Sequence, residues 1–129
     1  MFTHKITRSW QNADQTTTLP YVETVSADGE TNRDVTVANA ASNLEVDVNL
    51  PTTALKSLFI ASDEDITLKS NSSGSPDQTF TIKGGVPMMW TANEGVSNPI
   101  TTAVTKFYVS NSSGQDAELQ IRALVDSTP

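Results

Sequence analysis

With 129 residues, a formal net charge of -7 and no cysteine, the chain has the size of one ordinary domain, and we expect residues 1–129 to form a single one. The eight lysine and arginine residues are scattered, which argues against nucleic acid as a partner, and the lack of cysteine excludes disulfides and thiolate chemistry. No run approaches the roughly 18 apolar residues of a membrane span, and the N-terminus lacks the apolar region of a secretory signal. We therefore expect neither a membrane partner nor export.

Apolar and polar residues alternate in many short segments, which is typical of half-buried β-strands. Threonine and serine are abundant, and this composition disfavours helix. A short helical turn after Pro51 is the one exception considered. The predicted strands are residues 2–10, 16–25, 34–38, 44–50, 58–61, 66–69, 80–82, 86–90, 104–110 and 117–125.

Turn signals separate these strands and predict how some of them pair. We expect one hairpin around the acidic turn at residues 63–65 and another around residues 111–116, with Gly114 in its loop. Residues 26–30 are expected to reverse the chain at Gly29, and the tail begins at residue 126. Residues 91–103 are too long for a hairpin loop and are expected to cross between sheets.

The spacing of strands and turns predicts an all-β fold, an antiparallel β-sandwich that is most simply a jelly roll. An up-and-down barrel is the less favoured alternative because of the long connection at residues 91–103. The alternating positions predict the core. We expect most of it to come from Leu44, Val46, Val48, Phe59, Ile66, Leu68, Phe80, Ile82, Phe107, Val109, Leu119 and Ile121.

No residue pattern in the chain carries a catalytic or cofactor signature. His4 is the only histidine, so a Ser-His-Asp constellation would depend on it alone, and a surface histidine is the preferred interpretation. Asp63, Glu64 and Asp65 offer hard oxygen atoms on one turn, but their spacing is not that of a calcium loop, and a solvated turn is preferred. We predict no enzyme activity, no cofactor and no metal site, and leave ion binding by this turn open.

Three side chains are candidates for a protein interface. Met89 and Trp90 belong to the largest apolar cluster of the chain, and Trp10 ends the first predicted strand. Methionine and tryptophan are enriched in interfaces, although core packing is the preferred interpretation for Met89 and Trp90. Asn71 and Asn111 each begin an Asn-Ser-Ser sequence, which we interpret as a turn rather than as a glycosylation site.

Several segments between residues 55 and 129 together resemble the small capsid decoration proteins, or cement proteins, of tailed bacteriophages. These segments are LFIASD from Leu58, ITLKSNSS from Ile66, Trp90, NPI from Asn98, FYVSN from Phe107 and IRALVD from Ile121. The resemblance implies a β-sandwich without enzyme activity on the outer surface of an icosahedral head. It also implies a homo-oligomer, a dimer or trimer, that clamps neighbouring major capsid protein subunits after assembly in the host cytoplasm. The alternatives are a tail, fibre or baseplate module of a virion, or a carbohydrate-binding module.

Overall fold

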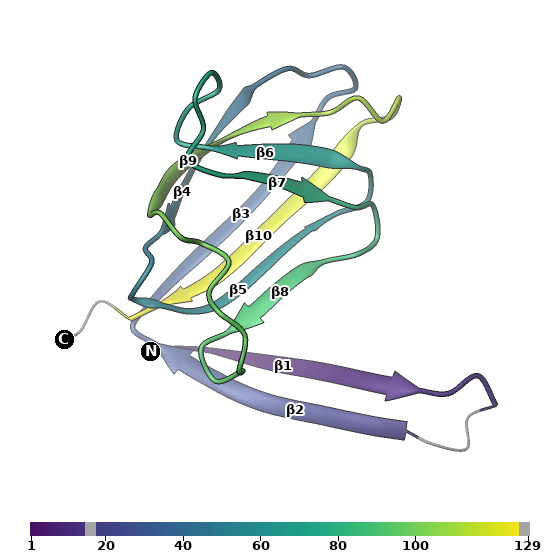
Figure 1. Ribbon diagram of the computed structural model, residues 1–129, viewed down its shortest axis with the longest axis vertical. Coiled ribbons are helices and arrows are strands. Elements are labelled where there is room, and N and C mark those ends of the chain that lie inside the picture. The colour runs from purple at the N-terminus through teal and green to yellow at the C-terminus, as the bar shows by residue number, and fades with distance from the viewer. Residues whose placement is uncertain (15–17, 127–129) are drawn as a thin grey trace.

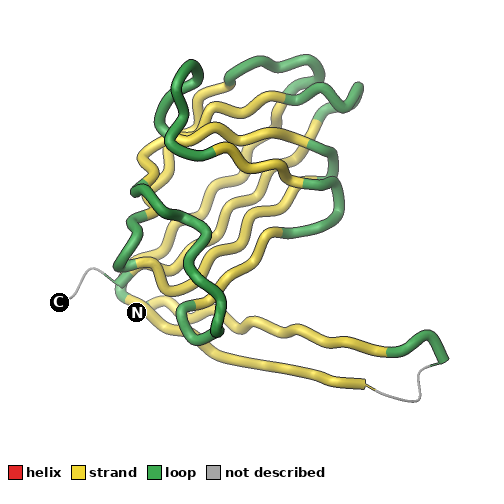
Figure 2. Tube along the Cα trace, viewed as in Figure 1, coloured by secondary structure: helices red, strands yellow, loops and turns green. Residues whose placement is uncertain are grey.

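The computed structural model describes residues 1–14 and 18–126, and in these residues every regular element is a strand (Figure 2). The bend that follows Pro51 does not become a helix. Of the predicted second strand, residues 16–17 lie outside the described residues, as do residues 127–129 of the predicted tail. The strands are β1 (Phe2–Gln11), β2 (Thr18–Ala27), β3 (Gly29–Val37), β4 (Leu44–Leu50), β5 (Leu55–Ser62), β6 (Ile66–Ser70), β7 (Thr79–Ile82), β8 (Met88–Thr91), β9 (Val104–Ser110) and β10 (Ala117–Val125).

Two four-stranded antiparallel sheets pack face to face and confirm the predicted sandwich (Figure 1). The strand orders are β3-β10-β5-β8 and β4-β9-β6-β7. Within these sheets β3 pairs with β10, β4 with β9, β5 with β8, and β6 with β7, so the pairs are nested along the chain. A long antiparallel ribbon wrapped in this way is a jelly roll.

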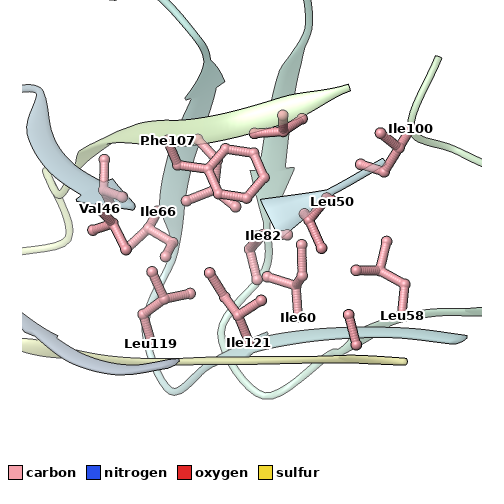
Figure 3. Close-up of a cluster of buried hydrophobic side chains, with 14 of the residues drawn as sticks. Val46, Leu50, Leu58, Ile60, Ile66, Ile82, Ile100, Phe107, Leu119 and Ile121 are labelled. Atoms are coloured by element: carbon pink, nitrogen blue, oxygen red, sulfur yellow. The ribbon is translucent and has the colours of Figure 1, made fainter. Parts of the chain in front are cut away.

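Apolar side chains from both sheets fill the space between the layers (Figure 3). They come from the inward positions of the strands, because successive side chains of a strand point to opposite faces. Phe107 is fully buried, and its ring meets Phe80 edge to face with 6.3 Å between centroids. Ile100 and Trp90 also belong to this core.

Two of the predicted core residues were wrong. Leu44 has the inward phase of β4 but remains 37% exposed, because it lies at the end of an edge strand. Phe59 lies on the outer face of β5, whose inward residues are Leu58 and Ile60. Alternation could not fix the phase of this strand because apolar residues occupy both of its faces. Val48 and Phe80 are half-buried against the core, and the other predicted members are fully buried.

Two predicted hairpins were also wrong. The acidic turn connects β5 and β6, and residues 111–116 connect β9 and β10, but each connection crosses from one sheet to the other. Crossing connections follow from the nested pairing, which leaves β6–β7 as the one hairpin between neighbouring strands inside the sandwich. The connection from β8 to β9 crosses between the sheets as expected.

The remaining two strands form a hairpin that projects from the sandwich (Figure 1). β2 leads into β3 through a bend at Asp28 rather than the predicted reversal, and Gly29 does not take a positive φ. A Cβ at Gly29 would come within 3.2 Å of the Val125 carbonyl oxygen. A small apolar cluster joins the base of the hairpin to the sandwich, and it consists of Val25, Ala27 and Leu124 with Ile6 beside them.

Candidate functional site

One face of the β1–β2 hairpin runs from the sandwich into solvent. Residues opposite one another in an antiparallel pair share a face, and one face carries the pairs Ile6 with Glu23, Arg8 with Tyr21, and Trp10 with Leu19. Ile6 and Glu23, the pair nearest the sandwich, are half-buried. Beyond it the same face is open, and Trp10 and Leu19 are 56% and 62% exposed.

Polar contacts hold the proximal part of this face on the sandwich. His4 Nδ1 lies 3.1 Å from Ser57 Oγ, and His4 Nε2 lies 2.8 Å from Glu30 Oε2. The contact with His4 and a second with Asn32 lower the pKa of the Glu30 carboxyl below its usual value. The single histidine therefore links β1 to two strands of one sheet.

A second polar group lies where the hairpin passes the connection after β8. Arg8 forms an ion pair with Glu94 at 2.6 Å, and Tyr21 Oη donates a hydrogen bond of 2.9 Å to Glu23 Oε2. The hydroxyl of Thr91 is the main cause of a lowered pKa of the Glu23 carboxyl, followed by Tyr21 and Asn93. The bond to Glu23 in turn raises the pKa of Tyr21. These contacts add to those of His4 and hold the hairpin on the sandwich further along β1 and β2.

A cleft of about 640 Å³ lies between β1 and the outer face of the sheet that contains β5. Its floor includes Arg122, Phe59 and Met89, which are neighbours across β10, β5 and β8. Five consecutive β1 residues, Thr3–Thr7, form its wall, and none of the β2 residues with described side chains lines it.

The structure separates the three predicted interface residues. Trp10 lies on the open end of the hairpin, whereas Met89 is half-buried on the floor of the cleft. Trp90 is 7% exposed, belongs to the core, and donates a hydrogen bond of 2.8 Å from Nε1 to the Val96 carbonyl oxygen. Of the three, Trp10 is thus the exposed side chain, at 56%.

Sequence reasoning missed the other apolar side chains near the hairpin tip. Leu19, Tyr21 and Val22 are all exposed, and the first two share the face of Trp10. The signal was present in the two consecutive alternating segments, because pairing them around residues 11–17 places Trp10 opposite Leu19. Their exposure could not be read from the sequence.

His4, Ser57 and Glu30 bring together the residue types of a hydrolase triad, but the surroundings do not favour catalysis. Ser57 is 3% exposed and lies on a strand paired on both sides, so neighbouring backbone amides are engaged in the sheet. An oxyanion hole needs donors free to meet the developing charge. The arrangement instead fits a structural link between hairpin and sandwich.

The acidic turn uses its carboxylates to hold backbone groups. Asp65 Oδ1 accepts a hydrogen bond of 2.7 Å from the Gly84 amide, which is the main cause of its lowered pKa. Asp63 Oδ1 accepts one of 2.8 Å from the Glu118 amide. In residues 1–14 and 18–126, no three histidine, cysteine or acidic side chains are grouped to hold a metal ion.

The two Asn-Ser-Ser sequences lie in turns, as predicted. Asn71 has a positive φ of 66° and bonds to the Ala103 carbonyl oxygen and the Thr105 amide. Asn111 is buried and donates to the carbonyl oxygens of Val37 and Gln115. Both side chains replace backbone partners that these turns would otherwise lack.

Comparison with known proteins yields no relative of this chain. No family model matches it, and no curated protein and no solved structure matches it significantly. Among the described residues, no helix is long and apolar enough to cross a membrane.

Proposed function

We propose that this protein is a structural virion component that decorates an icosahedral phage capsid and stabilises it by binding across major capsid protein subunits on the outer surface. One observation carries the proposal. A neutral hairpin extends beyond a compact sandwich and presents Trp10, Leu19 and Tyr21 on one uncovered face. Large side chains in such a patch are typical of protein contacts.

The charge distribution supports the hairpin as the part that makes contact. Residues 1–27 contain two basic side chains, Lys5 and Arg8, and two acidic ones, Asp14 and Glu23. The net charge of -7 therefore lies entirely on the rest of the chain. Contacts through the hairpin avoid the repulsion that an acidic partner would meet at the sandwich.

Open sheet edges support self-association on the particle. β3 and β8 are the outer strands of one sheet, and β4 and β7 are the outer strands of the other. Each has one edge without a strand partner among the described residues, and such edges favour covering by another chain. A dimer or trimer on the capsid would cover them, with the particle assembled in the host cytoplasm.

Binding to undecorated capsids tests the proposal. We expect Trp10→Ala to reduce occupancy at least tenfold, because a central aromatic contact is worth on the order of 2 kcal/mol. Val86→Ala is the matched control, since Val86 is an exposed apolar residue of the sandwich. Occupancy should change little with salt, because the contact is apolar. Absence of binding by the wild-type protein would overturn the function, and equal binding by both variants would remove the hairpin from the interface.

The hairpin also gives one observation in favour of a carbohydrate-binding module, the second candidate. Trp10 and Tyr21 are exposed on the same face, where aromatic rings could stack on a sugar. A glycan array distinguishes the two functions. Binding to a glycan that is lost in Trp10→Ala, together with no binding to capsids, would favour the second candidate over the first. The same array covers a tail, fibre or baseplate module that binds a cell-surface glycan.

A further inference from the structure

We propose that the cleft beneath β1 binds an extended polypeptide segment of a partner protein, which adds to the open edge of β1 as a third strand of the hairpin sheet. The segment would carry apolar side chains on one face and carboxylates on the other. This inference goes beyond the proposed function and does not require a capsid.

The wall of the cleft is a strand edge. β1 pairs with β2 on one side, and no described strand pairs with its other side. Side chains alternate along a strand, so a wall made of the five consecutive residues Thr3–Thr7 must include the backbone edge itself. Unpaired N–H and C=O groups along such an edge are the template for strand addition. The lined length corresponds to about five residues, or about 17 Å of extended chain.

The floor of the cleft selects for apolar side chains. His4 and Ile6 face the sandwich, so the side chains of an added strand that point the same way would meet Phe59 and Met89. Both of these residues are half-buried on the outer face of the sheet. Their cross-strand pairing makes one continuous apolar surface beside the hairpin.

Two basic side chains, Lys5 and Arg122, line the cleft together with one carboxylate, Glu30. Arg122 is already paired with Asp34 at 2.8 Å, which leaves Lys5 to meet an acidic partner. Lys5 lies on the hairpin face turned away from the sandwich, where its neighbours in an added strand would be the outward side chains. Opposite charges in neighbouring strands stabilise pairing, so carboxylates are favoured there.

The other edge of the hairpin is less suited to the same role. Pro20 lies in β2 opposite Ser9, and proline lacks the amide that a ladder needs. Proline on an outer strand blocks addition of a further chain. The open edge of β1 remains available, and it is the one that borders the cleft.

A synthetic peptide tests the proposal on the full-length protein. The probe is a capped seven-residue peptide of alternating valine and glutamate. Two controls accompany it, one with a central proline and one with lysine in place of glutamate. We expect the probe to bind and to slow hydrogen exchange at alternate amides of residues 3–7, as strand pairing requires. Each control should bind at least tenfold more weakly.

Two charge reversals locate the binding site. Lys5→Glu should weaken binding of the probe about tenfold, whereas Lys83→Glu should leave it within about twofold. Lys83 is the matched control because it makes the same charge change at an exposed site outside the cleft. Met89→Glu, which places a carboxylate on the floor, should also weaken binding.

Three results would overturn the proposal. The first is no binding of the probe, and the second is equal binding of the proline control, which would indicate charge attraction without a strand. The third is concentration-dependent self-association that protects the β1 amides without any peptide. That result would assign the cleft to a second copy of this chain.

Discussion

The hairpin and the sandwich are built on different principles although they belong to one chain. The sandwich closes two sheets over a core whose buried members, in the part of the chain that the structure describes, begin at Val37. The hairpin has two strands, a separate small cluster at its base and exposed apolar residues at its tip. A lone two-stranded hairpin is marginally stable in water, so this one depends on its contacts. The comparison indicates that the sandwich provides stability and that the hairpin is the part suited to binding.

The largest difference in unfolding free energy should appear between the loss of an aromatic side chain in the core and the loss of one near the hairpin tip. Phe107→Ala is expected to lower the free energy of unfolding by about 3–5 kcal/mol, because it leaves a cavity between the sheets. Trp10→Ala should change it by less than about 0.5 kcal/mol, since Trp10 is largely exposed. Chemical denaturation of both variants measures the difference. Comparable losses in the two would mean that the hairpin tip supports the fold.

Removal of residues 1–27 asks whether the sandwich folds alone. We expect a cooperatively folded β-protein with unfolding free energy lowered by about 1.5–3 kcal/mol, chiefly because Leu124 loses its cover of Val25 and Ala27. Circular dichroism and denaturation measure the outcome. An unfolded product would show that the hairpin is required for the sandwich, which would break the comparison.

Asn111 allows a buried polar contact of the sandwich to be compared with an exposed one of the hairpin. Asn111→Ala should cost about 1–3 kcal/mol, because it leaves the buried carbonyl oxygens of Val37 and Gln115 without their donor. The hairpin counterpart is the exposed bond between Thr3 and Ser26 at 2.9 Å. Thr3→Ala should cost less than about 0.5 kcal/mol. Thermal unfolding of the two variants measures both losses. A small effect of Asn111→Ala would show that the buried hydrogen bonds of Asn111 contribute little to stability.

Acid should loosen the hairpin before the sandwich. Glu23 and Glu30 both have a lowered pKa, so their contribution is present above the ordinary value of about 4.5 and is lost as the pH falls through the folded-state pKa. The pKa of Asp65, which lies in the sandwich, is also lowered, but Asp65 is not part of the apolar core. Hydrogen exchange at pH 7, 5 and 3.5 should show β1 and β2 opening first. Simultaneous loss of protection in β5 and β10 would refute this order.

Alternation in the sequence was enough to predict the sandwich and part of every strand, because one face of each strand must be apolar when two sheets pack together. Residues 29–33 of β3 were not predicted as strand. Alternation predicted Val46, Leu68 and Ile121 in the core, and the structure buries all three. It could not decide which face points inward in strands that carry apolar residues on both faces. Phe59 therefore turned outward against the prediction, and so did Met89, for which core packing was preferred. Trp90 lies in the core, as preferred for it.

The candidate site was only partly predictable for a related reason. Trp10 could be singled out from its residue type, but its pairing with Leu19 depends on hairpin register, and its exposure depends on where the sandwich ends. The cleft combines residues from β1, β5, β8 and β10, which are far apart in sequence. No local pattern specifies such a surface, because it arises where separate elements meet.

The two Asn-Ser-Ser-Gly turns show which features the local sequence determines and which the tertiary structure determines. The sequence by itself determined that both segments turn, because the asparagine side chain replaces backbone partners, and in the first turn Asn71 also takes a positive φ. Only the tertiary structure decided that the first turn joins the paired strands β6 and β7, whereas the second carries the chain from β9 in one sheet to β10 in the other. The physical reason is that a turn depends on local backbone chemistry. Strand pairing depends instead on which edges lie together once both sheets have closed over one core.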